Sequence, residues 1–244
     1  MSEYSISQVY PSDKYSLSQI DTLLQKEGIT RDSNLDYICA LRDGNVEIIA
    51  TGSCFGATLR CFAVSSAHQG EGLLNEIISH LMEVQYSRGN MHLFLYTKIK
   101  SAKFFGDLGF YEIARVDGTL VFMENRKSGF PNYLKSLEKT KKSGVSAALV
   151  MNANPFTLGH QYLVETAAAQ CDTLHLFVLS EDASLVPFAV RKKLVQAGVD
   201  HIPNVVLHDS GPYIISSATF PSYFLKDEAA VIDGHARLDL AVFS

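Results

Sequence analysis

The first half of the chain alternates between two patterns of apolar residues, one typical of strands and one typical of helices. Runs rich in β-branched and aromatic residues predict strands, and apolar residues at helical spacing, such as Ile20, Leu23 and Leu24, predict helices. The predicted strands are 35–43, 46–55, 59–65, 91–97, 110–116 and 119–125, and the predicted helices are 17–28, 73–89 and 101–109. We therefore expect one mixed α+β domain over residues 1–128.

The second half has a more regular order of elements. A connecting helix or linker is predicted at 129–144. After it, short buried strands at 145–151, 174–180 and 204–209 alternate with helices at 158–172 and 186–200. This order implies a parallel sheet with right-handed crossovers, as in the first half of a doubly wound, Rossmann-like fold. The predicted fold class is therefore α/β, with a partial doubly wound second domain at 145–244.

Composition and charge exclude several classes of protein. The 244 residues are 47% hydrophobic and 19% charged, with a formal net charge of −5, which is unlike a disordered chain. No apolar run reaches about 18 residues and the first residues lack a secretory pattern, so we expect no membrane span and a cytoplasmic location. Residues 143–244 hold 5 Lys and Arg against 10 Asp and Glu, so we expect no nucleic-acid binding. The four cysteines lack C-x-x-C spacing, so we expect no metal site.

A glycine-containing turn precedes the long predicted helix of the first domain. Gln69, Gly70 and Gly72 lie there in the sequence Q-G-E-G-L. Such glycines can bring main-chain N–H groups to an anion at a helix N-terminus, although an ordinary turn is the alternative. With FFGDLGFYE at 104–112, this order resembles the GNAT acetyltransferase superfamily. The resemblance implies acetyl-CoA contacts at Gln69, Gly70 and Gly72.

Two details limit what that resemblance says about catalysis. Leu74 stands where the superfamily has a further Gly or Ala. No base can be assigned, because Glu47, His68 and Tyr111 are candidates by residue type only.

The segment ALVMNANPFTLGH at 148–160 gives the strongest chemical signal in the sequence. A buried strand ends at Met151, and a helix begins after Thr157. Gly159 would permit close approach of the main chain to phosphate, and Thr157 and His160 would add side-chain donors. Donors held in this way can stabilise charge on a phosphorus centre during in-line displacement. The alternative is that Thr157 is only a helix cap and His160 a partly buried helix residue.

This segment resembles the nucleotidyltransferases that carry an H/T-x-G-H motif, which act on the α-phosphate of a nucleoside triphosphate, usually with Mg²⁺. VPFAVRKKLVQAGVDHIPNV at 186–205 is similar to phosphopantetheine adenylyltransferases, with Arg191 as the matching arginine. The resemblance implies catalytic roles for His160 and Thr157. The implied nucleotide-binding residues are Asn152, Asn154, Phe156, Thr157, Gly159, His160 and Arg191.

The two domains in this order, with SGPYIISSATFPSYFLKDE at 210–228, resemble the citrate (pro-3S)-lyase ligase family. The resemblance implies ATP-dependent acetylation of the thiol prosthetic group on the acyl-carrier subunit of citrate lyase, a dephospho-CoA derivative. Acetate would attack the α-phosphate of ATP, and the thiol would then take the acetyl group from acetyl-adenylate.

The family's chains continue past the point that matches Ser244 and carry a later I-S-x-S-x-x-R motif that binds the triphosphate. ISSATF at 215–220 has no arginine after it, so the hypothesis is a truncated chain that lacks the last part of the second domain. Three alternatives stay open: a nucleotidyltransferase acting on a pantetheine-like phosphate, an acetyl-CoA-dependent N-acetyltransferase, and an inactive fragment.

Overall fold

The computed structural model divides the chain into two compact units. The structure describes residues 4–181, 184–215, 220, 221, 223, 225 and 228–243. Unit 1 comprises Met1–Gly129 with Pro221–Ser244, and unit 2 comprises Phe130–Phe220. Both units combine helices with sheets, which confirms the predicted α/β class.

Unit 1 is built on a seven-stranded sheet with the strand order β1-β2-β3-β4-β5-β7-β6. Its strands are β1 (Ser5–Gln8), β2 (Tyr37–Arg42), β3 (Ile48–Phe55), β4 (Thr58–Val64), β5 (Phe94–Thr97), β6 (Tyr111–Val116) and β7 (Leu120–Glu124). The β4–β5 pair is parallel and the other pairs are antiparallel. The edge strand β1 was not predicted, because the short polar segment SISQ lacks an apolar alternation and is held by main-chain pairing to β2.

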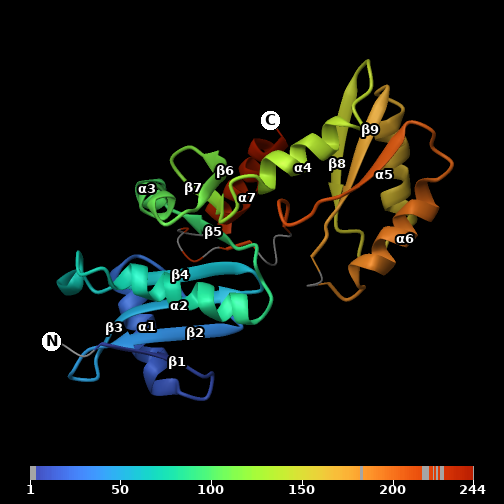
Figure 1. Cartoon of the computed structure of the whole chain (residues 1–244). Coiled ribbons are helices and arrows are strands. Elements are labelled where there is room, and N and C mark those ends of the chain that lie inside the picture. Colours follow the sequence, from blue (N-terminus) through green and yellow to red (C-terminus); the bar gives the residue numbers. More distant parts are fainter. Residues whose placement is uncertain are drawn as a thin grey trace. The chain divides into compact units, whose positions relative to one another are not determined.

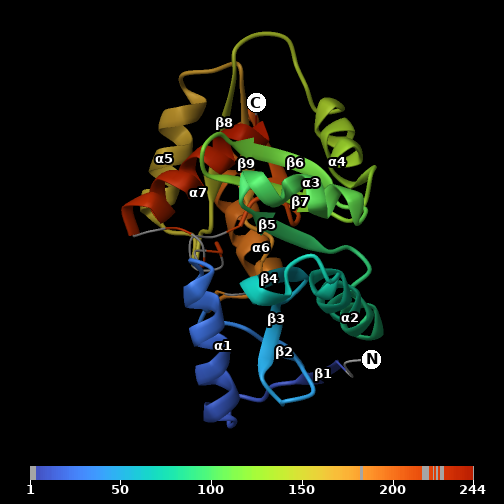
Figure 2. The same cartoon turned by 90° about the vertical axis from the view of Figure 1, so that its left-hand side faces the viewer.

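Two helices cover opposite faces of this sheet (Figures 1 and 2). Helix α1 (Lys14–Lys26) buries Leu17, Ile20, Leu23 and Leu24 in one core, and α2 (Leu73–Ser87) buries its apolar stripe in another. A Cβ atom added to Gly52 on β3 would lie 2.5 Å from Ile77 and 2.9 Å from Leu81. Glycine at this position therefore lets α2 approach the sheet closely.

Strands β4 and β5 pair over a short distance and then separate. Their register contains only Thr58 with Phe94 and Leu59 with Leu95. An irregularity in the β3–β4 pairing follows, and Cys61 within it has a φ of 53°. A bulge bends its strand, so the ends of β4 and β5 diverge just before η1 (Ser66–His68) and α3 (Ile99–Asp107).

Unit 2 contains a three-stranded parallel sheet in the order β10-β9-β8, as the alternating sequence pattern predicts. Its elements are α4 (Gly129–Glu138), β8 (Ser146–Met151), α5 (Leu158–Ala168), β9 (Thr173–Val178), α6 (Phe188–Val199) and β10 (Val205–Asp209). Helices α5 and α6 pack on the same face of the sheet (Figure 1), around Leu174, Leu176 and Val195.

The predicted second domain covers residues 145–244, whereas in the structure residues 221–244 group with unit 1. Tyr223 is 5% exposed in the core beneath α1, and α7 (Glu228–Phe243) packs on β6. Gly234 of α7 lies against Thr119 and Leu120. Part of the 210–228 segment, including residues 216–219, lies outside the described residues.

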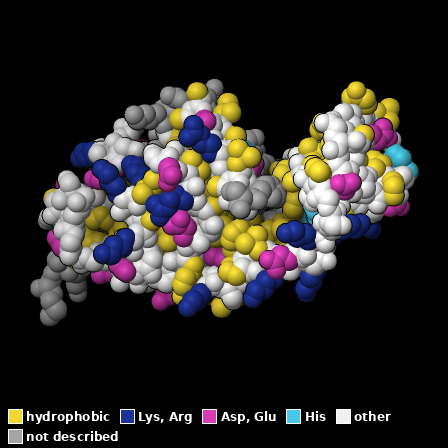
Figure 3. Space-filling view, turned by 90° about the horizontal axis from the view of Figure 1, so that it is seen from above, with side chains coloured by type: hydrophobic (Ala, Val, Ile, Leu, Met, Phe, Trp, Pro, Cys, Tyr) yellow, Lys and Arg dark blue, Asp and Glu magenta, His cyan; other side chains and the backbone are white. Residues whose placement is uncertain are grey.

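On the face shown in Figure 3, Lys and Arg side chains are interspersed with Asp and Glu side chains, so neither sign forms a continuous field there. Within the described ranges, no helix combines the length and the apolar character needed to cross a membrane. The same ranges contain no group of three or more His, Cys, Asp or Glu side chains placed to hold a metal ion.

Candidate functional site

The loop that follows β8 lies at the carboxyl end of the parallel sheet in unit 2, the edge where open α/β sheets bind ligands. Asn152 follows β8 directly, and its side chain exchanges hydrogen bonds with Ser184, from Nδ2 to Oγ at 3.0 Å and from Oγ to Oδ1 at 3.1 Å. Asn154 Oδ1 accepts a hydrogen bond from the main-chain N of Val186 at 2.9 Å. Both asparagines therefore hold the 184–186 segment against the loop.

Thr157 and His160 form the start of α5. Nδ1 of His160 lies 3.2 Å from the main-chain N of Thr157 and 2.8 Å from its Oγ1. Because the main-chain N–H can only donate, Nδ1 acts as the acceptor, and the neutral imidazole then carries its proton on Nε2. Nε2 has no partner among the described residues, so it is available to donate to a ligand. Thr157 is thus a helix cap, as the alternative interpretation held, and it also orients His160.

Gly159 and Phe156 shape the space around this imidazole. A Cβ atom on Gly159 would meet only Oγ1 of Thr157, at 3.7 Å, so the main chain there faces open space. The Phe156 ring stacks on His160 with centroids 5.7 Å apart. A Cβ atom on Gly198 of α6 would lie 2.3 Å from Phe156, so Gly198 provides the space in which Phe156 packs.

Arg191 has a different environment from the one predicted for a phosphate ligand. It is 0% exposed on α6, and its guanidinium donates hydrogen bonds only to oxygen atoms of this chain. Nη1 donates to Asn152 O at 2.8 Å, to Asn152 Oδ1 at 2.9 Å and to Leu179 O at 2.9 Å. Nε donates to Val186 O at 2.8 Å, and Nη2 donates to Glu181 O. Arg191 therefore joins the ends of β8 and β9 to the 184–186 segment.

The sequence interpretation missed three residues of this region. Ser184 bonds Asn152, Gly198 accommodates Phe156, and Ser210, which is 0% exposed, accepts a hydrogen bond through its Oγ from the main-chain N of Ser180 at 2.9 Å. A glycine inside a predicted helix is a signal for close packing. The two serines carry no comparable signal, because their spacing in the sequence is irregular.

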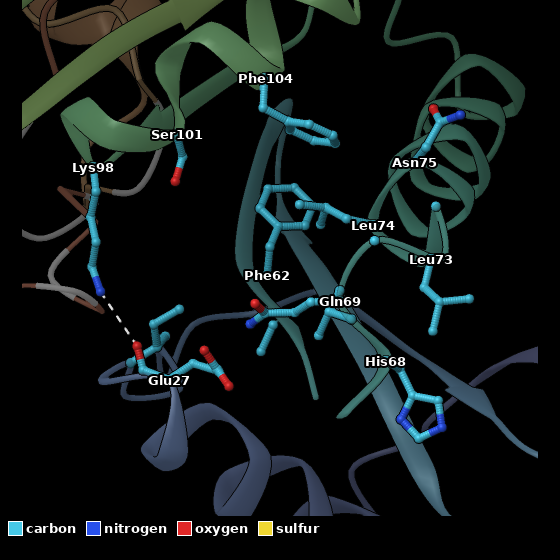
Figure 4. A pocket seen from close by; sticks show the side chains of 15 residues that line it. Glu27, Phe62, His68, Gln69, Leu73, Leu74, Asn75, Lys98, Ser101 and Phe104 are labelled. Carbon is cyan, nitrogen blue, oxygen red and sulfur yellow. Dashed lines mark hydrogen bonds between the residues drawn. The ribbon is translucent and has the colours of Figure 1, made fainter. Parts of the chain in front are cut away.

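Unit 1 holds a separate cavity of about 560 Å³ at the diverging ends of β4 and β5 (Figure 4). The three residues predicted to contact acetyl-CoA all line it: Gln69, Gly70 and Gly72. Gly70 and Gly72 have φ values of 89° and 81°, which L side chains rarely adopt, so the turn itself requires glycine.

The three bases suggested by residue type are not brought together. His68 lines the cavity of unit 1, whereas Glu47 lies exposed in the turn between β2 and β3 and Tyr111 is 40% exposed on β6. Burial raises the pKa of the Cys39 and Cys61 thiols to about 12. Buried thiols of this kind are poor nucleophiles.

Comparisons with known proteins identify a matching family model and several relatives in sequence. Residues 146–244 match the family model of the citrate lyase ligase C-terminal domain. Citrate (pro-3S)-lyase ligase from Klebsiella pneumoniae is 39% identical over 232 residues, which cover 95% of this chain and 68% of that protein. The proteins of the same name from Haemophilus influenzae and Escherichia coli are 36% and 37% identical, with 70% and 67% of their lengths covered.

Two solved structures also match about half of this chain. A GNAT-family acetyltransferase from Staphylococcus aureus is 14% identical, with a TM-score of 0.42 over 51% of this chain and 100% of its own. The ribosomal-protein-S18-alanine N-acetyltransferase from Escherichia coli is 18% identical, with a TM-score of 0.41 over 50% of this chain and 92% of its own. On the identity and coverage of the three ligases, this chain belongs to the citrate (pro-3S)-lyase ligase family, which is a family of enzymes.

Proposed function

We propose that this chain catalyses the ATP-dependent acetylation of the thiol prosthetic group on the acyl-carrier subunit of citrate lyase. Membership of the ligase family supports this reaction, because the three relatives carry that name. The observation in the structure that best supports it is the geometry of His160, whose Nε2–H is available at the carboxyl end of a parallel sheet.

The proposed chemistry has two steps. A carboxylate oxygen of acetate attacks the α-phosphorus of ATP, and the bond from phosphorus to pyrophosphate breaks, which gives acetyl-adenylate. The thiol sulfur then attacks the acetyl carbonyl carbon, AMP leaves, and the thiol proton passes to solvent. The products are AMP, pyrophosphate and the acetyl thioester.

The residues of the loop have distinct proposed roles in the first step. His160 Nε2–H donates to the phosphate oxygens as negative charge grows on them, and Thr157 keeps the imidazole in the tautomer that can donate. Gly159 lets the phosphate approach the first turn of α5. Asn152, Asn154 and Phe156 shape the site, and Arg191 holds the loop from behind.

Mg²⁺ is a further expectation for a reaction of ATP. Residues 152–160 offer amide and hydroxyl oxygens and imidazole nitrogen, but no carboxylate. Mg²⁺ in nucleotide sites is held largely by phosphates and water. The loop therefore fits a metal that arrives with ATP, and its own residues contact the phosphates.

The test is ATP–pyrophosphate exchange by the purified chain, with and without acetate. We expect exchange that requires acetate, and His160→Ala should lower its rate about 10²-fold, as loss of a preorganised donor does. His201→Ala is the matched control, because His201 is an exposed histidine paired with Glu165 of α5.

Exchange that is independent of acetate but needs a pantetheine-like phosphate would replace the ligase by the nucleotidyltransferase alternative. A loss of less than about threefold in His160→Ala would remove His160 from the mechanism.

A further inference from the structure

Two large apolar side chains beside the candidate site of unit 2 are almost fully exposed. Leu185 is 92% exposed and Leu158 is 83% exposed, the highest values for large apolar side chains in the described part of the chain. Both border the loop of residues 152–157, because Leu158 follows it directly and Leu185 lies in the 184–186 segment that is bonded to it. A single exposed leucine is ordinary on a protein surface, but several that border one site mark a surface that binds a partner.

The main chain on both sides of Leu185 is held in place. Ser184 exchanges two hydrogen bonds with Asn152, at 3.0 Å and 3.1 Å, and the main-chain N of Val186 donates to Asn154 Oδ1 at 2.9 Å. Leu185 is therefore exposed to solvent between two anchored neighbours. A partner that buries it loses little affinity to the ordering of this segment, because the segment is already ordered before binding.

Helix α5 continues the apolar surface from Leu158. Tyr162 is 71% exposed and stands four residues after Leu158, so the two side chains lie one turn apart on the same face of the helix. Residues 158–164 contain no Lys, Arg, Asp or Glu. We call Leu158, Tyr162 and Leu185 the apolar rim.

Helix α6, which follows Leu185, adds positive charge. Lys192 pairs with Asp209 at 2.8 Å, whereas Lys193 is exposed and has no ion-pair partner among the residues that the structure describes. This side of unit 2 therefore combines large apolar side chains with an unpaired positive charge. Such a surface complements a protein partner whose exposed apolar side chains are accompanied by carboxylates.

The substrates of the proposed reaction differ in whether they need such a surface. ATP and acetate are small and charged, and N–H donors at a helix start suit their phosphate and carboxylate oxygens. The thiol arrives on a protein, and its sulfur has to reach the acetyl-adenylate beside His160 Nε2. A carrier that delivers its thiol to this point has to contact the surface around residues 152–157, where the apolar rim lies.

We propose that the apolar rim is the surface on which the acyl-carrier subunit of citrate lyase docks. The inference rests on the proposed function, in which this subunit is the acetyl acceptor. Apolar side chains of the carrier cover Leu158, Tyr162 and Leu185, and carboxylates of the carrier lie near Lys193. Docking there holds the thiol-bearing arm beside the loop and raises the local concentration of the thiol at the adenylate.

The test separates the two steps of the reaction, because acetate-dependent ATP–pyrophosphate exchange needs no carrier whereas thioester formation does. Leu185→Gln and Tyr162→Gln should each raise the KM for the carrier at least about fivefold, the loss expected from an interface anchor. The exchange rate and the KM for ATP should stay within about twofold of the unmodified chain. Leu240→Gln is the matched control, because Leu240 is a 70% exposed leucine of α7 in unit 1 and should leave every value unchanged.

Direct binding of the carrier to the full chain, measured by titration calorimetry, gives a readout that does not depend on activity. We expect Leu185→Gln and Tyr162→Gln to weaken binding by the same factor as the change in KM. Added salt should weaken binding to the unmodified chain, and this salt dependence should be smaller in Lys193→Gln. Thermal unfolding of each variant checks that it is folded.

An unchanged KM and an unchanged affinity for the carrier in folded Leu185→Gln and Tyr162→Gln would overturn the proposal. A raised KM for ATP or slower exchange in these variants would also overturn it, because the apolar rim would then belong to the nucleotide site. A dimer of the chain that these variants dissociate, with carrier binding unchanged, would overturn it as well, because the apolar rim would then join two copies.

The two readouts distinguish failure of this inference from failure of the proposed function. Absence of acetate-dependent exchange in the unmodified chain would refute the adenylation chemistry. The calorimetric comparison of the unmodified chain with Leu185→Gln would still decide whether the carrier docks on the apolar rim.

Discussion

Replacing Arg191 tests whether this arginine supports the loop or contacts the nucleotide. Arg191→Met removes the charge and all donors while keeping a similar length. Five hydrogen bonds to oxygen atoms of Asn152, Leu179, Glu181 and Val186 are then lost. A single hydrogen bond to a charged group contributes about 1.5–3 kcal/mol to stability, but such contributions are not additive. Acceptors at the ends of loops can also form hydrogen bonds with water once the guanidinium is removed.

We expect Arg191→Met to lower the free energy of unfolding of unit 2 by about 3–5 kcal/mol, because several buried oxygen atoms lose their donor and each such loss costs about 1–3 kcal/mol. Arg191→Lys should recover only part of this, because one ammonium group cannot reach oxygens that lie around a planar guanidinium. Urea unfolding of the full chain gives the stability change, and amide hydrogen exchange on β8 and β9 locates it in unit 2.

The outcome distinguishes two roles for the same residue. A positioning role predicts a large loss of stability together with weaker ATP binding. If Arg191→Met changes the free energy of unfolding by less than about 1 kcal/mol but abolishes ATP binding, the guanidinium contacts phosphate and the reasoning from its buried hydrogen bonds is refuted.

Three further predictions concern other residues. Gly159→Ala should raise the thermal stability slightly, because alanine is favoured over glycine in a helix by up to about 1 kcal/mol. The same substitution should lower the affinity for ATP, and an unchanged affinity would show that phosphate does not approach Gly159. Tyr223→Phe should lower the free energy of unfolding by about 1–3 kcal/mol, because the buried oxygen of Tyr96 loses its donor; an unchanged melting temperature would contradict this. The pKa values of His175 and His208 lie below the ordinary value of 6.5, mainly because burial disfavours the charged ring. The charge of Lys142 lowers the pKa of His175 further. At His208, His175 lowers the pKa further and Asp209 opposes the shift. Their neutral forms stabilise the folded state above pH 6.5, and this stability should be lost progressively as the pH falls below 6.5. His175→Gln should show a smaller loss in thermal melts over the same acid range.

Much of the candidate site could be predicted because its chemistry is local in the sequence. A strand ending at Met151, a loop and the T-x-G-H helix start lie within about ten residues, and the structure places Thr157 and His160 in contact, as their spacing in one helical turn requires. The partners of Asn152 and Asn154 could not be predicted in this way. They come from the 184–186 segment, some thirty residues away, and only chain folding brings them together.

Arg191 shows where residue type alone is insufficient. A basic residue at the start of a helix in an acidic half of the chain suggests a phosphate ligand, but its burial depends on how α6 packs against the ends of β8 and β9. The same limit applies to Gly198 of α6, because its role depends on where the ring of Phe156, in the loop after β8, packs.

The sequence by itself determined the α/β class, the order of strands and helices, the two glycine-containing turns and the family. Each of these depends on periodicity, backbone freedom or residues close together in the chain. Only the tertiary structure decided that α7 and Tyr223 belong to unit 1 and that the Tyr223 hydroxyl donates a hydrogen bond to Tyr96 O of β5. An apolar helix face or a tyrosine can be buried against any complementary core, so its partner is decided by packing between distant segments, which local pattern does not encode.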